Sequence, residues 1–158
     1  MSAPIAVKRV VVVFWAAWFT IVFLTNLFDA LKALGMVGEG WAFASGNWAF
    51  MVKTTAIYHL PTSAVALLFA GVLAWECLAA ISMWLVVGAP CHAPDRRSAP
   101  AVYRAFAVAL GLFGAFMIAD EIFIAYPVEG THLRIFVTLL VSLLAVCLLP
   151  DETDARTG

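Results

Sequence analysis

The chain consists of long apolar runs separated by short segments that carry most of the charged and turn-forming residues. A helix needs roughly 20 apolar residues to cross a hydrocarbon core of about 30 Å, so each run predicts one transmembrane helix. The fold class expected is therefore all-α, an integral membrane bundle of four transmembrane helices. We expect one transmembrane domain over residues 1–150 and a disordered polar tail over residues 151–158. The predicted spans cover about residues 10–28, 61–87, 101–126 and 133–149.

The segment between the first two spans, residues 33–60, differs from an ordinary polar loop. Glycines interrupt it, and tryptophan, phenylalanine and tyrosine recur along it. Such rings settle at the level of the lipid headgroups. Asn47 is a candidate cap for a short helix that ends near Tyr58. This aromatic-rich interfacial segment is expected to lie flat on the membrane or to fold over the mouth of the bundle.

Composition agrees with the pattern of runs. Hydrophobic residues make up 65% of the chain and charged residues 12%, and the formal net charge is -1, so the lipid bilayer is the expected surrounding. No cluster of Lys and Arg is present that could neutralise a run of phosphates, so nucleic acid is not an expected partner. No P-loop, G-x-S-x-G, H-E-x-x-H or dinucleotide-binding fingerprint occurs. We therefore expect a protein that is not an enzyme and that carries no cofactor.

The distribution of basic residues predicts the orientation in the membrane. Cytoplasmic loops of membrane proteins carry an excess of Lys and Arg. With a cytoplasmic N-terminus the inner side holds six of these residues and the outer side three, which favours both termini in the cytoplasm. The inner set is Lys8, Arg9, Arg96, Arg97, Arg104 and Arg156, and the outer set is Lys32, Lys53 and Arg134.

Small residues recur at every fourth position in the second and third spans, and such stripes allow close approach of helix backbones. They predict that these two spans pack as an antiparallel hairpin, although alanine is also simply common in membrane helices. The stripes are Ala66, Ala70 and Ala74 in the second span and Ala107, Gly111, Ala115 and Ala119 in the third.

Glu76 is the most informative single residue, because it lies near the middle of the second span. A carboxylate at that depth costs a few kcal/mol on insertion scales and is usually retained for a partner, a proton or a ligand. One interpretation is a proton or ion step, or a bond to a partner subunit. The other is a protonated carboxyl that bonds to a neighbouring helix.

Further charged residues gather toward the outer ends of the spans and form candidate partner- or ion-binding positions. Asp120 and Glu121 project about 100° apart on a helix, so they are not expected to hold one ion together. A salt bridge from Arg134 to one of them is the simpler interpretation. Asp29 belongs to the same group of candidates, in which His59 and Lys32 also fall.

Histidines give a weaker indication of a metal or haem. His59 and His132 both fall at the outer boundary and could ligate a haem from two segments. Cys91 and His92 are too few for a zinc site, which needs three or four ligands. Solvated or structural histidines are the alternative, as is common for isolated histidines in polar segments.

Several short sequence features occur in a fixed order along the chain: Asn26-Leu27-Phe28-Asp29, Glu76 followed by Gly88, Gly114 to Phe116 leading to Glu121 and Phe123, Gly130 with Arg134, and Pro150-Asp151. In these features the chain resembles a family of bacterial predicted small integral membrane proteins that has no assigned function. It departs from that family at Ala125-Tyr126 and at Val128-Glu129-Gly130, where the family tends to show tryptophan. The resemblance implies a four-helix protein of the bacterial inner membrane in which Asp29, Glu76 and Glu121 are characteristic.

Three functions follow as hypotheses. The first is an accessory or scaffold subunit that binds other membrane protein subunits or a second copy of itself. The second is a proton- or ion-coupled transporter element that uses Glu76 together with Asp120 or Glu121. The third is a haem- or quinone-associated redox anchor with His59 and His132 as ligands.

Overall fold

The structure is a computed structural model that describes residues 3–88 and 99–149. Within these ranges every regular element is helical, and four of the helices are long and apolar enough to cross a membrane. The prediction of an all-α protein with four candidate transmembrane helices is confirmed. The elements are α1 (Ala3–Ala33), α2 (Asn47–Thr55), the 3-10 helix η1 (Ala56–Tyr58), α3 (Thr62–Gly88), α4 (Ala99–Ile122) and α5 (Tyr126–Leu148).

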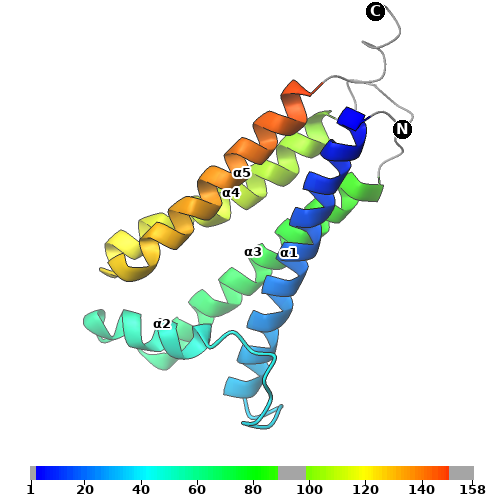
Figure 1. The fold of residues 1–158 in the computed structure, drawn as a ribbon. Helices are drawn as coiled ribbons and strands as arrows, with labels where there is room; N and C mark the ends of the chain where they lie inside the picture. Colours follow the sequence, from blue (N-terminus) through cyan, green and yellow to red (C-terminus); the bar gives the residue numbers. More distant parts are fainter. Residues whose placement is uncertain (1–2, 89–98, 150–158) are drawn as a thin grey trace, which may run out of the picture.

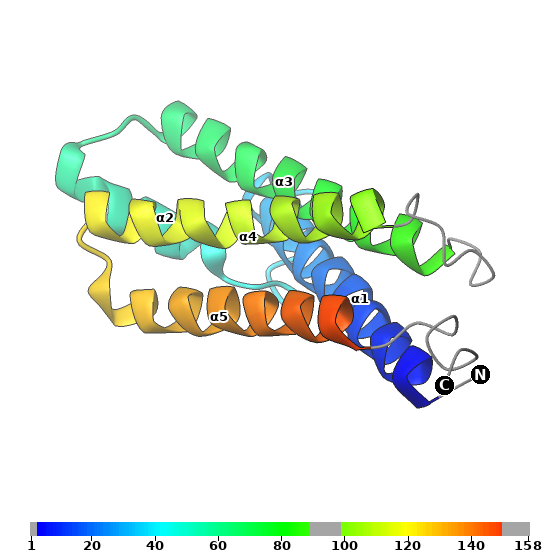
Figure 2. The ribbon, with the colours of Figure 1, turned by 90° about the horizontal axis from the view of Figure 1, so that it is seen from above.

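The four long helices form two antiparallel pairs, α1 with α3 and α4 with α5, and α3 also contacts α4. Figures 1 and 2 show that the pairs approach each other at the end where α1 begins and α5 ends. They diverge toward the other end, where α2 lies against α1 and α3. The bundle therefore has a packed end and an open end.

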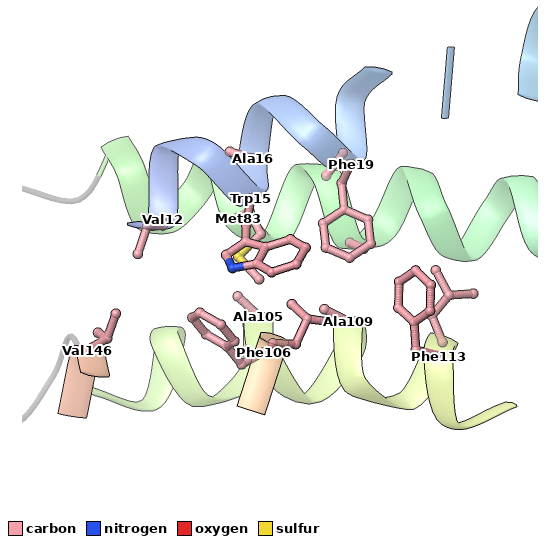
Figure 3. Close-up of a cluster of buried hydrophobic side chains, with 14 residues drawn as sticks. Val12, Trp15, Ala16, Phe19, Met83, Ala105, Phe106, Ala109, Phe113 and Val146 are labelled. Carbon is pink, nitrogen blue, oxygen red and sulfur yellow. The ribbon is translucent and has the colours of Figure 1, made fainter. Parts of the chain in front are cut away.

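The buried apolar core occupies the packed end. Trp15 and Phe19 of α1 point toward Phe106, Ala109 and Phe113 of α4, as Figure 3 shows. Alanines at such contacts let helix backbones approach closely, and the large rings fill the space between them. The packed end is therefore close-packed, as protein interiors usually are, and it is closed to solvent.

Tryptophan indoles join the helices by hydrogen bonds. The indole N–H of Trp15 donates to Ser142 Oγ at 2.9 Å, which ties α1 to α5. That of Trp84 donates to Thr20 Oγ1 at 2.9 Å and ties α3 to α1. The indole N–H of the buried Trp15 needs an acceptor, whereas Trp84 is exposed. Each bond helps to align the two helices that it joins.

The predicted use of the small-residue stripes is wrong in part. The helices α3 and α4 do pack together, but Ala66, Ala70 and Ala74 are exposed on the surface of the bundle. Other faces of α3 make this contact, and one of its residues is Trp75, whose ring lies 3.1 Å from the position of a Cβ on Gly111. In a membrane helix both the lipid-facing and the buried positions are apolar, so the sequence pattern does not reveal which stripe is buried.

The boundary between the last two spans also differs from the prediction. The helix α4 ends at Ile122, and α5 begins at Tyr126 with Pro127 in its first turn. Proline is tolerated there because the first N–H groups of a helix have no intrahelical acceptor. The third span was expected to run to residue 126, whereas the structure places Tyr126 and Pro127 in the first turn of α5. Ile124 makes the turn between the two helices with a φ of +56°.

A short helix is present in the aromatic-rich segment, as predicted, but Asn47 does not cap it. Gly46, with a left-handed φ of +78°, occupies the cap position. Because glycine has no side chain, the first turn of α2 receives no hydrogen bond from its cap residue. The amide group of Asn47 is directed to Asn26 instead. The placement of this segment at the membrane interface stays a prediction. The predicted tail, residues 151–158, lies outside the described residues.

Candidate functional site

Glu76 lies in the middle of α3 and is 2% exposed. Its Oε1 accepts a hydrogen bond of 2.6 Å from the amide Nδ2 of Asn26 on α1. Its Oε2 is buried and has no hydrogen-bond partner among the described residues. Burying a polar atom without a partner costs roughly 1–3 kcal/mol, so this oxygen is the place where a ligand or a proton would be stabilised most.

The partner of Glu76 is itself held in place. The carbonyl Oδ1 of Asn26 accepts a hydrogen bond of 2.8 Å from Nδ2 of Asn47 at the start of α2. Asn26 thus uses its acceptor toward α2 and a donor toward Glu76, which fixes the orientation of its amide. A chain of hydrogen bonds therefore runs from α2 through α1 to the buried carboxyl on α3.

Asp29 anchors α2 and does not belong to the cavity described below. Its Oδ2 accepts a hydrogen bond of 2.7 Å from the backbone N–H of Trp48 and one of 3.2 Å from Ser45 Oγ. The Trp48 N–H lies in the first turn of α2, where helix amides lack intrahelical acceptors. A carboxylate from another helix supplies the cap that α2 lacks.

Asp120 and His132 form a second polar pair, between α4 and α5. The imidazole Nδ1 lies 2.6 Å from Asp120 Oδ2, and Asp120 is 5% exposed. The expected salt bridge from Arg134 is therefore wrong for Asp120. Arg134 Nε donates to the carbonyl of Gly130 in its own helix, at 2.8 Å.

Glu121 is exposed, as expected for a residue about 100° around the helix from Asp120. It does not line the cavity. Of the two neighbouring acids, the structure brings only Asp120 to the same site as Glu76. The outward position of Glu121 makes it a matched control for substitutions at that site.

Glu76 and the Asp120–His132 pair line one cavity of about 460 Å³. The cavity lies where the two helix pairs diverge, and residues of α1, α2, α3, α4 and α5 all contribute to it. Its volume is in the range typical of sites for small organic ligands. The polar lining consists of Asn26, Asn47, Thr54, Thr55, Glu76, Asp120, Thr131 and His132, and the aromatic lining of Trp18, Phe19, Phe50, Phe69, Trp75, Phe113, Phe116 and Phe123.

The two acids lie at different depths in this cavity. The Trp75 indole donates to the carbonyl of Val108 at 3.0 Å, so Glu76 is level with the middle of α4. Asp120 follows Val108 by about three turns of α4, which corresponds to about 18 Å along the helix at a rise of 1.5 Å per residue. Glu76 is the deep acid, and Asp120 lies near the open end.

A row of aromatic rings connects the two depths. The ring centroid of Phe113 lies 5.8 Å from that of Trp18 and 5.5 Å from that of Phe116. Phe116 in turn lies 5.0 Å from the His132 ring. These spacings are typical of interacting aromatic pairs. One wall of the cavity is therefore lined by a row of contacting aromatic rings.

The histidines do not form a common site. His59 lies on an exposed left-handed turn after η1 and does not line the cavity, whereas His132 does. Within residues 3–88 and 99–149, no group of three His, Cys, Asp or Glu side chains could hold a metal ion. Cys91 and His92 lie outside those ranges.

Two residues of the site, Asn26 and Asn47, were not predicted as partners of Glu76. Asn26 precedes Asp29 by three positions, so the two residues share a face of α1. That spacing was the available signal that this face binds a polar segment. The identity of the partner depends on how α1 and α3 are aligned, which the sequence does not give.

The chain matches no known protein family model, and it matches no curated protein and no solved structure. The resemblance described above therefore rests on the quoted residues alone. Any functional interpretation depends on the geometry of the cavity.

Proposed function

We propose that this membrane protein is a proton-coupled transporter element, not a catalyst, in which Glu76 exchanges a proton with a solute in the cavity. The observation that supports this most is the unpartnered Oε2 of Glu76 at the deep end of a cavity that also contains Asp120. Ionisable groups inside a membrane bundle are typical of proton relays and solute sites.

The difference between the two ends of the bundle favours a carrier rather than an open channel. The cavity occupies the divergent end, while the packed end is filled by rings such as Trp15 and Phe106. A carrier exposes its site to one side at a time, commonly by rocking one group of helices against another. The α1–α3 and α4–α5 pairs are the natural groups for such a motion, because they diverge toward the end that holds the cavity.

Proteoliposomes test the proposal. Liposomes loaded with acid and the pH dye pyranine receive Na⁺, K⁺ or tetraethylammonium outside, cations that do not carry protons across the lipid themselves. A primary organic ammonium, 1-naphthylmethylammonium, is added in a fourth sample, with protein-free liposomes as its background because the neutral amine also crosses the lipid. We expect at least one of the four cations to speed proton exit above that of protein-free liposomes. The acceleration should disappear in Glu76→Gln, because the amide cannot exchange a proton.

Glu121→Gln is the control, since Glu121 is exposed and outside the cavity, and it should keep the wild-type rate. Circular dichroism and a monodisperse elution profile establish that each variant is folded. No cation-driven proton exit in the wild type, or full activity in Glu76→Gln, would contradict the proposal.

The second candidate is an accessory or scaffold subunit of a membrane protein complex. It is supported by Ala66, Ala70 and Ala74, which form a small-residue stripe on the outside of α3. Such a stripe suits close contact with a helix of another subunit or of a second copy. Mass measurement after purification in mild detergent tests it, because a monomer without a stoichiometric partner would remove this role.

For the location we propose the bacterial inner membrane with both termini in the cytoplasm, on the basis of the basic residues at the two ends of the spans. The cavity would then open toward the outer side, because it lies at the end opposite the start of α1. C-terminal fusions to green fluorescent protein and to alkaline phosphatase test this. We expect fluorescence and no phosphatase activity, and the reverse would invert the topology.

A further inference from the structure

The charges around the cavity indicate which ligand it can hold. The acidic side chains of its lining are Glu76 and Asp120, and within the described part of the chain His132 is the sole basic one. His132 is already bonded to Asp120, at 2.6 Å. Glu76 therefore has no cationic partner in the lining, and its Oε2 accepts no hydrogen bond from residues 3–88 or 99–149.

A charge in such a surrounding needs a counter-ion, because an unpaired buried carboxylate is strongly disfavoured. A ligand can supply it as a cation whose N–H group donates to Oε2. One such N–H group would supply Glu76 with both the positive charge and the hydrogen-bond donor that the lining does not provide.

The aromatic side chains of the lining indicate the chemistry of the part of the ligand that carries no charge. Trp18, Phe19, Phe69 and Trp75 line the same cavity as Glu76, and the aromatic row continues through Phe113. Aromatic faces attract organic cations, with energies of about 2 kcal/mol or more in a desolvated site. They also bind the apolar or aromatic part of a ligand, because the contact removes its surface from water. A small hydrated metal ion would leave this surface unused.

We propose that the cavity binds a monovalent organic ammonium ion with an apolar or aromatic body, whose N–H group bonds to Glu76 Oε2. This assignment rests on the proposed transport function and adds the chemical class of the solute. Proton and ammonium then compete for one carboxylate, which is the simplest basis for exchanging one against the other. A neutral ligand would not compete with the proton in this way, because its binding needs no charge on Glu76.

Direct binding tests the ligand class without any gradient. The full-length protein in lipid nanodiscs is dialysed against 1-naphthylmethylammonium or against its neutral analogue 1-naphthalenemethanol, with protein-free nanodiscs as background. We expect saturable binding of the ammonium and about tenfold or more weaker binding of the alcohol. Equal affinity for the two compounds would overturn the assignment.

Glu76→Gln should lower the affinity for the ammonium by about tenfold or more and leave the alcohol unaffected. Glu121→Gln should bind both compounds as the wild type does. Unchanged ammonium binding in a folded Glu76→Gln protein would also overturn the assignment.

A measurement on the unsubstituted protein covers the case in which Glu76→Gln does not fold. Lowering the pH should weaken ammonium binding but not alcohol binding, because protons neutralise the carboxylate. The other titratable groups that line the cavity are Asp120 on α4 and His132 on α5, while Asp29 on α1 and Lys53 on α2 lie outside it. The profile is repeated in His132→Gln, since a protonated imidazole would also repel a cation, and a pH-independent affinity there contradicts the proposal.

The outcomes separate the two proposals. Ammonium binding without cation-driven proton exit leaves the ligand class in place and removes the transport function. Proton exit driven by Na⁺ or K⁺ without ammonium binding does the reverse.

Discussion

The packed end and the open end of the bundle use similar residues to different effect. At the packed end, alanines such as Ala16 and Ala109 allow the helices to approach, and Phe106 fills the remaining space. At the open end, aromatic side chains also line the interior, but the helix pairs diverge and a cavity of about 460 Å³ remains. The polar groups differ as well, because the buried acids Glu76 and Asp120 both face this cavity.

This difference assigns separate tasks to the two ends. Close packing contributes dispersion and burial energy and resists changes of volume. An interior that keeps a cavity and an unpartnered carboxyl oxygen gives up part of that energy. Proteins retain such features where a ligand binds, so stability is expected to reside at one end and function at the other.

The largest expected effect is the contrast between two phenylalanines on α4. Phe106 is fully buried at the packed end, whereas Phe116 is half-buried beside the cavity. Phe106→Ala should lower the free energy of unfolding by about 3–5 kcal/mol, because it creates a new void in a close-packed region. Phe116→Ala should cost markedly less, since it only enlarges an existing space. Chemical unfolding in detergent micelles, followed by circular dichroism, measures both, and equal losses would remove the distinction between the ends.

A smaller effect is expected at Asp29, which connects the open end to α2. Asp29→Leu removes the acceptor for the Trp48 N–H and for Ser45 Oγ, and hydrogen bonds to charged groups contribute about 1.5–3 kcal/mol. Hydrogen–deuterium exchange should therefore speed up over Asn47–Thr55 and stay unchanged in the core of α4. Asp29→Asn keeps an oxygen acceptor and should show an intermediate rate. Protection of α2 as in the wild type after Asp29→Leu would show that other contacts hold it.

The four spans were predictable because a bilayer imposes a length and an apolar composition on every crossing helix. Glu76 was predictable as a special residue for the same reason, since a carboxylate in such a run is costly. Both inferences depend on one segment at a time. They need no knowledge of how the segments meet.

The contacts between segments were not predictable. The bond from Asn26 to Glu76 joins residues 50 positions apart, and it depends on the alignment of two helices. The pairing of Asp120 with His132 depends on where α4 ends, and the predicted third span ran on to residue 126, four residues past the end of α4 at Ile122. The exposed alanines of α3 show the same limit, because lipid and protein interior both favour apolar side chains.

The smallest predicted effect concerns two glycines of α4, of which Gly111 faces α3 of the other helix pair and Gly114 faces α5 of its own pair. A Cβ on Gly111 would lie 3.1 Å from Cζ2 of Trp75, whereas one on Gly114 would meet Phe136 at 3.8 Å, an ordinary contact. Alanine is favoured over glycine in a helix by about 1 kcal/mol, so Gly114→Ala should be neutral or slightly stabilising. Gly111→Ala must displace the Trp75 ring, which donates to the Val108 carbonyl and lines the cavity, and should fall below Gly114→Ala in thermal stability. Thermal unfolding and tryptophan emission measure both variants. If the two melt alike with unchanged emission, the Trp75 contact does not set the separation of the helix pairs.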